Sequence, residues 1–225
     1  MVRENRKWEV LSLSLGLGLV AAVAALLFFA WLANEVLEGE LQHFDEVTRV
    51  GIHQLATPAL TFTMQGISFL GSTIFLTSAT TLTVIWFALR HWRRESFLFA
   101  ATMIGAAILN TTLKLTFKRS RPVPYFNLLA PESYSFPSGH ALASFCFYGA
   151  LAAILTAKIR NRKTRLLIWL IAGAMVLLIG FSRIYLGVHY TTDVLAGYSA
   201  ALIWVVVVRF AESQLVRRSN RRRAN

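Results

Sequence analysis

Two histidines and one aspartate in the second half of the chain have the spacing of a nucleophilic site. His189 and Asp193 are four residues apart, so on a helix the carboxylate lies beside the imidazole. A carboxylate bonded to one ring nitrogen fixes the tautomer and leaves the other nitrogen free to attack. His140 adds a second imidazole that can donate or accept a proton. These three residues are the catalytic candidates.

Three cations have the chemistry to hold the oxygens of a phosphate. Lys114 and Arg121 are seven residues apart, which places them on one face if a helix continues to the break at Pro122. Arg183 stands six residues before His189. A guanidinium binds two phosphate oxygens at once, and an ammonium supplies a point charge. We expect all three cations to meet one anionic ligand.

The stretch Pro137-Ser138-Gly139-His140 predicts the start of a helix that binds an anion. The Ser138 hydroxyl and the Gly139 amide are then further phosphate ligands, although Ser138 alone is equally typical of a helix cap. Lys118 and Arg119 are interpreted as ordinary surface cations or as contacts with lipid headgroups.

The composition places these residues in a membrane protein. Of 225 residues 56% are hydrophobic and only 15% are charged, yet the formal net charge is +12. Long apolar runs exclude a nucleic-acid-binding protein with a polar basic face. High apolar content and a single cysteine exclude disorder and a disulfide scaffold. Cys146 lies in an apolar run, which predicts a buried, unpaired thiol.

Six apolar runs are long enough to cross a bilayer as helices. They predict an all-α, integral-membrane bundle of six transmembrane helices that forms a single domain over residues 1–225, with a catalytic core at 114–193. The runs are Leu11–Ala33, Ser72–Leu89, Phe97–Leu115, Ser138–Ala157, Leu166–Phe181 and Asp193–Phe210. The first run is longer than the apolar region of a signal peptide, so we interpret it as a span.

The segment between the first two runs, residues 34–71, mixes acidic and apolar residues. Pro58, Gly66 and Gly71 interrupt it, which favours amphipathic helices in the membrane interface over a further span. A cap over the site or a guide for lipid access is the hypothesis for this segment.

The distribution of basic residues predicts the orientation in the membrane. With the N-terminus in the cytoplasm, 17 of the 23 Lys and Arg residues fall in cytoplasmic segments. Both termini are then cytoplasmic, and the site faces the extracytoplasmic side. The basic tail at 211–225 is interpreted as a topology anchor that touches anionic lipid rather than as a nucleic-acid arm.

Taken together, K-x6-R-P, P-S-G-H and S-R-x5-H-x3-D resemble the three-part signature of the type-2 phosphatidic acid phosphatase superfamily. Every signature position between Lys114 and Asp193 is filled. The six-helix layout is similar to the integral-membrane lipid phosphatases of that family over most of the remaining chain.

This resemblance implies a lipid phosphatase with a phosphohistidine intermediate. His189 would be the nucleophile, Asp193 its orienting partner, and His140 the general acid and then base. The implied phosphate ligands are Lys114, Arg121, Ser138, Gly139 and Arg183.

Neither a cofactor nor a metal is expected, because no cluster has metal-ligand spacing. The expected partners are the bilayer and a lipid phosphate in a bacterial inner membrane, without nucleic acid; oligomeric state stays open. Phosphatidylglycerophosphate, undecaprenyl pyrophosphate and phosphatidic acid all remain as substrates. Two alternatives from other classes are halide oxidation, as in vanadate-dependent haloperoxidases, and a catalytically silent lipid-binding or transport protein.

Overall fold

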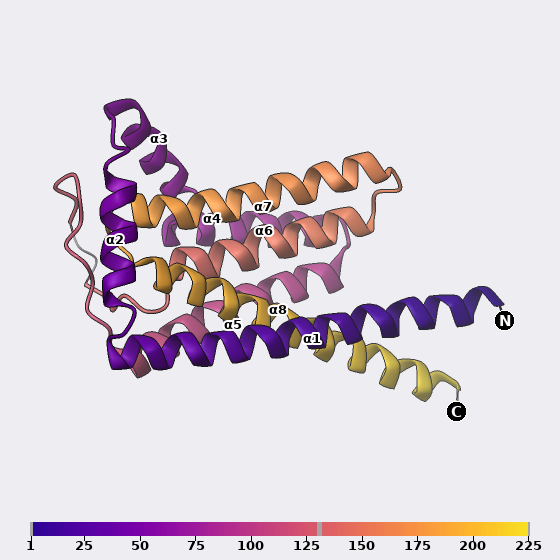
Figure 1. Cartoon of the computed structure of the whole chain (residues 1–225). Helices are drawn as coiled ribbons and strands as arrows, with labels where there is room; N and C mark the ends of the chain where they lie inside the picture. The colour runs from indigo at the N-terminus through magenta and orange to yellow at the C-terminus, as the bar shows by residue number, and fades with distance from the viewer. Residues whose placement is uncertain (1, 130–131, 225) are drawn as a thin grey trace.

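The computed structural model describes the backbone of residues 2–129 and 132–224, and the side chains within 16–215 of those ranges. The described residues form helices and connections without strands (Figure 1). The helices are α1 (Val2–Glu38), α2 (Gln42–His53), α3 (Pro58–Phe69), α4 (Thr73–Leu89), α5 (Arg93–Phe117), α6 (Gly139–Ala157), α7 (Arg162–Tyr185) and α8 (Thr191–Ala224). Each predicted apolar run falls on one of these helices, although α1 and α8 extend well beyond the runs Leu11–Ala33 and Asp193–Phe210.

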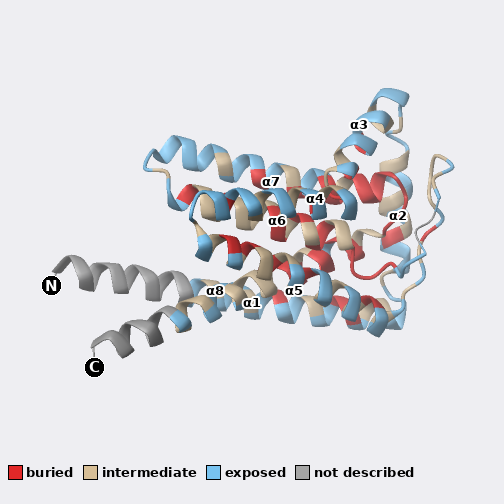
Figure 2. Ribbon diagram, turned by 180° about the vertical axis from the view of Figure 1, so that it is seen from behind, coloured by how far each residue is buried: buried red, intermediate tan, exposed pale blue. Residues whose placement is uncertain are grey.

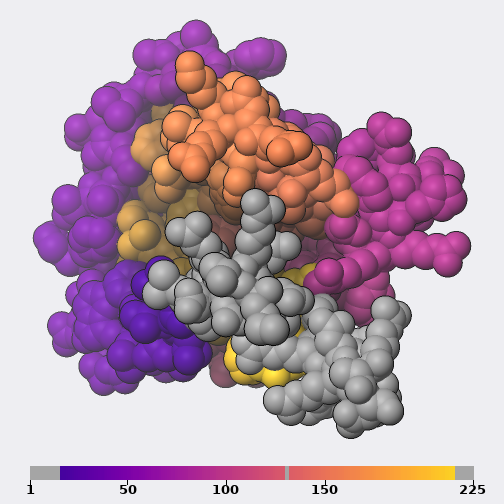
Figure 3. All heavy atoms as spheres, turned by 90° about the vertical axis from the view of Figure 1, so that its right-hand side faces the viewer, coloured from indigo at the N-terminus to yellow at the C-terminus, as the bar shows by residue number. Residues whose placement is uncertain are grey.

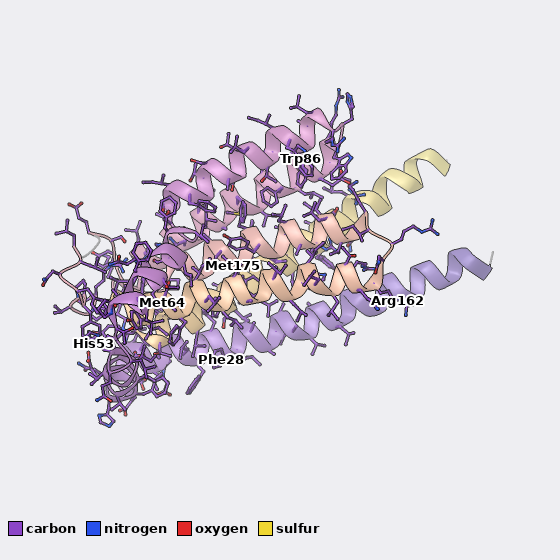
Figure 4. The ribbon with its side chains drawn as sticks, turned by 90° about the horizontal axis from the view of Figure 1, so that it is seen from above. Phe28, His53, Met64, Trp86, Arg162 and Met175 are labelled. Atoms are coloured by element: carbon purple, nitrogen blue, oxygen red, sulfur yellow. The ribbon has the colours of Figure 1, made fainter. Side chains whose placement is uncertain are left out.

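The long helices lie side by side, and α2 crosses one end of the bundle (Figure 1). α6 packs against α5, α7 and α8, while α1 packs along α8. Figure 4 labels His53 of α2 and Arg162 of α7 at opposite ends of the bundle. Figure 3 views the Arg162 end, where the α4–α5 connection (magenta) and the α6–α7 connection (orange) both appear. The bundle therefore has one end covered by α2 and another formed by basic connections.

Within the described part of the chain, five helices are long and apolar enough to cross a membrane: α1, α5, α6, α7 and α8. A sixth span is reached if α3 and α4, bent by 45° at their break, count as one. Many large apolar residues on these helices are exposed, and Figure 2 shows exposed residues (pale blue) along the outside of the bundle. An all-helical, multi-span membrane protein is thus confirmed, while the number of six spans stays a prediction.

Residues 34–71 form the end of α1, then α2 and α3, as short helices rather than one uninterrupted span. Capping explains where α3 and α4 begin, since Thr57 and Ser72 accept hydrogen bonds from the backbone amides of Leu60 and Phe75. The interfacial position of α2 and α3 stays a prediction. The side chains at 216–224 in the basic tail lie outside the described residues.

Gly105 allows α5 and α8 to approach closely. A Cβ added there would lie 1.9 Å from a ring carbon of Trp204 on α8. The indole therefore packs closely against α5, and its Nε1 donates to the carbonyl of Thr102 at 2.9 Å. Cys146 lies in the same core, between α5, α6 and α8, as the predicted buried free thiol.

We expect Gly105→Ala to destabilise the bundle by about 1–3 kcal/mol, because the methyl group displaces Trp204 from a packed interface. Thermal unfolding of purified protein in detergent measures the loss. The matched control is Gly149→Ala in α6, where an added Cβ meets no atom within 4 Å. Equal melting temperatures for Gly105→Ala and the unaltered protein would contradict this account of the contact.

Candidate active site

One cavity brings the predicted residues of three separate segments together. It has a volume of about 760 Å³ and lies among α4, α5, α6 and the last turn of α7. Lys114 lines it from α5, His140 from the first turn of α6, and Arg183 from α7. Arg121 and His189 line it from the connections before α6 and α8. All five belong to the predicted site.

His189 is buried beside the carboxylate that its spacing predicts. Its Nδ1 lies 3.2 Å from Oδ2 of Asp193, and the two residues are 2% and 0% exposed. A proton on Nδ1 satisfies this contact and leaves the lone pair on Nε2, which lies 3.0 Å from Nη1 of Arg121. Burial lowers the pKa of His189 to about 3, although Asp193 opposes the shift. The imidazole is therefore neutral near pH 7, as a nucleophile must be.

Lys114 and Arg183 bring buried positive charge to the cavity. The ammonium of Lys114 donates to the carbonyl of Tyr134, and Arg183 donates to the hydroxyl of Ser68. Within the described residues, Nε of Arg183 is buried without a hydrogen-bond partner. A buried donor of this kind is costly unless a ligand satisfies it.

Arg121 supplies the third cation. Its guanidinium donates to the carbonyls of Ser133 at 2.6 Å and Val188 at 2.8 Å, and burial lowers its pKa. Among the described side chains, no carboxylate lies within 4.0 Å of the nitrogens of Lys114, Arg121 or Arg183. Three cations without an acidic partner favour an anion in the cavity.

His140 and Gly139 line the cavity at the N-terminus of α6. Backbone N–H groups in the first turn of a helix have no partner within the helix, so the Gly139 amide can bind an anion. A Cβ at Gly71 would lie 2.4 Å from Cγ2 of Ile179 on α7 and 3.2 Å from the His140 ring, so this glycine lets the α3–α4 connection pack closely against α7 beside the imidazole.

Ser138 has a different position from the other predicted ligands. It is fully buried, it does not line the cavity, and its hydroxyl accepts a hydrogen bond from the amide of Ala141 at 3.5 Å. This is the N-cap of α6. Its amide donates to the backbone carbonyl of Asp193 at 2.9 Å, which joins the starts of α6 and α8. Its contact with phosphate stays a prediction.

The expectation that a helix carries Lys114 and Arg121 on one face as far as Pro122 is wrong. α5 ends at Phe117, and Lys118 has a φ of 47°, the left-handed conformation that terminates helices. Both cations still line the cavity because the chain beyond α5 turns back over it.

The interpretation of Arg119 as a surface cation is also wrong, whereas Lys118 is exposed as expected. The Arg119 side chain is only 15% exposed and forms ion pairs with Asp45 at 2.8 Å and Asp193 at 2.7 Å. Burial opposes its charge, but the two carboxylates together raise its pKa. Asp45, on α2, is fully buried.

Sequence reasoning missed Asp45 and also Ser135, whose hydroxyl donates to Oδ2 of Asp193. The only sequence signal for Asp45 is an acidic residue in an amphipathic stretch, and that signal does not reveal its partner. Ser135 lies in the loop just before the predicted helix start, where serine is ordinary.

Comparison with known proteins agrees with this geometry. Residues 95–215 match the PAP2 superfamily. The chain is 31% identical to phosphatidylglycerophosphatase B of Bacillus subtilis (strain 168) over 87% of its own length and 96% of the relative. It is 35% identical to the undecaprenyl-diphosphatase BcrC of the same organism, over 54% and 61% of the two chains.

A solved structure shares the fold. The crystal structure of a transmembrane PAP2-type phosphatidylglycerolphosphate phosphatase from Bacillus subtilis superposes with a TM-score of 0.79 at 30% identity, over 86% of this chain and 96% of that one. Residues 95–215, which match the family, include every cavity residue between the start of α5 and the end of α8. The chain therefore belongs to the PAP2 superfamily, in its branch of membrane lipid phosphatases.

Proposed function

We propose that this protein is a metal-independent phosphatase that removes phosphate from a membrane lipid through a phosphohistidine at His189. One observation carries the proposal: Asp193 holds Nδ1 of a neutral His189, while three cations without acidic partners share the cavity with Nε2. The names of the relatives support hydrolysis of a lipid phosphate or diphosphate.

The geometry supports a two-step mechanism. Nε2 of His189 attacks phosphorus, and the bond from phosphorus to the leaving oxygen breaks as His140 donates a proton to that oxygen. His140 then accepts a proton from water, whose oxygen attacks phosphorus, and the N–P bond breaks to release inorganic phosphate. Asp193 stabilises the charge on His189 in both steps.

The remaining site residues would act on the nonbridging oxygens. Lys114, Arg121 and Arg183 supply positive charge, and the Gly139 amide supplies a dipole. These fixed charges would do what metal ions do in many phosphoryl-transfer enzymes. Ser138 would contribute only if its hydroxyl turned from the Ala141 amide toward the cavity.

The shape of the cavity supports a lipid substrate. From the site it continues between α4 and α5, past Thr80, Val84 and Ile104. A headgroup could therefore reach the cations while its chains stay among the membrane-spanning helices. The site lies at the α2 end, away from the basic connections, which supports an extracytoplasmic site with cytoplasmic termini.

Asn110 supports phosphatidylglycerophosphate as the first choice among the lipids. It lies one turn before Lys114 on the cavity wall, and a Cβ at Gly139 would be 3.1 Å from its amide nitrogen. Its buried Oδ1 has no partner among the described atoms. A glycerol phosphate headgroup carries a free hydroxyl next to its phosphate that can donate to this oxygen. Phosphatidic acid and a prenyl diphosphate have no such hydroxyl.

Neither alternative function gains support from the site. Binding alone would need the cations but not the buried pairing of His189 with Asp193. The relatives named above are phosphatases, and halide oxidation has no counterpart among them.

We expect His189→Ala to abolish phosphate release, because no other imidazole has both a carboxylate partner and a place in the cavity among the described residues. Phosphate release from lipid in mixed micelles measures the loss. His43→Ala, an exposed histidine on α2, is the control and should keep full activity. Turnover that survives in His189→Ala, or that a chelator removes from the unaltered protein, would reject the mechanism.

We expect His140→Ala to lower kcat on lipid phosphate by roughly 10²–10⁴-fold, the usual contribution of general acid–base catalysis. Because an aryl phosphate has a leaving group that needs little protonation, its first step should lose much less. Single-turnover formation of the phosphoenzyme with both substrates measures the difference. An equal loss with both would exclude His140 as the acid.

We expect Asn110→Leu to lower kcat/KM for phosphatidylglycerophosphate by roughly two- to twelvefold, corresponding to one neutral hydrogen bond of about 0.5–1.5 kcal/mol. Hydrolysis of phosphatidic acid should change little. Thr81→Val is the control, since Thr81 lines the same cavity but its hydroxyl already donates to the Thr77 carbonyl. Parallel losses with both lipids would contradict the role of Asn110.

A further inference from the structure

A buried carboxylate on α2 reaches the start of α8, where the catalytic aspartate lies. Oδ1 of Asp45 accepts a hydrogen bond from the amide of Thr192 at 3.0 Å, and Oδ2 accepts one from the Thr192 hydroxyl at 2.6 Å. Oδ2 also pairs with Nη2 of Arg119 at 2.8 Å. None of the residues of α2, a fully described helix, lines the cavity.

Arg119 connects this carboxylate to the catalytic one. Nη1 of Arg119 donates to Oδ1 of Asp193 at 2.7 Å and to the hydroxyl of Thr192 at 2.7 Å. Its guanidinium carbon lies 4.2 Å from the ring centroid of Tyr190, so the aromatic face supports it from the side. The guanidinium is therefore held on two edges by carboxylates and on one face by a ring.

The two oxygens of Asp193 consequently have separate partners. Oδ1 binds Arg119, whereas Oδ2 contacts Nδ1 of His189, accepts the amide of Tyr190 at 2.9 Å and accepts the hydroxyl of Ser135. Without Arg119 on Oδ1, only the donors on Oδ2 would resist rotation of the carboxylate about its Cβ–Cγ bond, a rotation that would move Oδ2 away from Nδ1 of His189. Since displacement of a reacting group by about 1 Å can cost 10²-fold in rate, this rotation matters for catalysis.

We propose that Arg119 and Asp45 are positioning residues for the nucleophile: Asp45 orients Arg119, and Arg119 orients the Asp193 carboxylate that holds His189. Neither residue lines the cavity, so both act through Asp193 and not on the substrate. The contacts of Asp45 with Thr192 and Arg119 therefore both hold α2 against the bundle and help to align His189 with Asp193. This inference rests on the proposed phosphatase function.

The test is Asp45→Asn, which keeps the shape of the side chain but removes its charge and places an amide next to Arg119. We expect kcat to fall roughly 10- to 10²-fold. KM and competitive inhibition by inorganic phosphate should change less than twofold because the three cavity cations are untouched. Thermal unfolding in detergent shows whether the variant is folded.

The matched control is Glu46→Gln, which removes the next carboxylate on the same helix. Glu46 pairs with Arg49 at 2.8 Å and does not contact Asp193, so all constants should be unchanged. A merely structural role for Asp45 predicts instead a lower melting temperature with kcat preserved in the folded fraction, and that result would overturn the proposal.

A second variant tests the order of the contacts. Arg119→Gln should lower kcat by at least as much as Asp45→Asn, and adding Asp45→Asn to it should have little further effect, because Asp45 acts through Arg119. If the two substitutions lowered kcat independently, so that their losses multiplied in the double variant, Asp45 would not act through Arg119. If the unaltered protein hydrolyses no lipid phosphate, the proposed function fails; if it does and both variants match it, only the positioning role fails.

Discussion

The hydrogen bond between Asp193 and His189 is the contact on which the rest of this structure depends. It joins the connection after α7 to the first turn of α8, and both partners are almost fully buried. Burying the charged carboxylate of Asp193 away from water would cost much free energy if no donors replaced the water. Ser135, the Tyr190 amide and Arg119 therefore surround Asp193 with donors. A satisfied, rigid carboxylate is what allows a neutral imidazole to keep one defined tautomer.

The fold places uncompensated positive charge next to that pair. Lys114 and Arg121 come from the end of α5 and the connection after it, Arg183 comes from α7, and close helix packing brings all three to one cavity. Gly71 contributes because a side chain there would clash with Ile179 on α7 and crowd the His140 ring. Since cations are expensive at the centre of a bilayer, a site at the end of the bundle is the place where a membrane protein can gather them. An anionic headgroup that arrives there relieves the repulsion among the cations.

Hydropathy predicts the membrane spans and motif spacing predicts part of the site, each for a different physical reason. The spans follow from composition, because each helix must satisfy its backbone in lipid by itself. The i, i+4 spacing on a helix predicts the pair His189 and Asp193, although His189 lies in the connection just before α8 and only Asp193 is on the helix. The contact between Asp45 and Arg119 joins residues 74 positions apart, and no local pattern encodes it. The end of α5 at Phe117 depends likewise on one left-handed residue, Lys118, whose type gives no warning.

The location of the phosphoryl group on the enzyme tests the central claim most directly. Turnover of a lipid phosphate would be quenched within the first cycle, and the modified peptide mapped by mass spectrometry under alkaline conditions that preserve phosphohistidine. The account predicts a single phosphoryl group on Nε2 of His189, formed before phosphate is released. A phosphoryl group on any other residue, or phosphate release without a labelled enzyme, would contradict it.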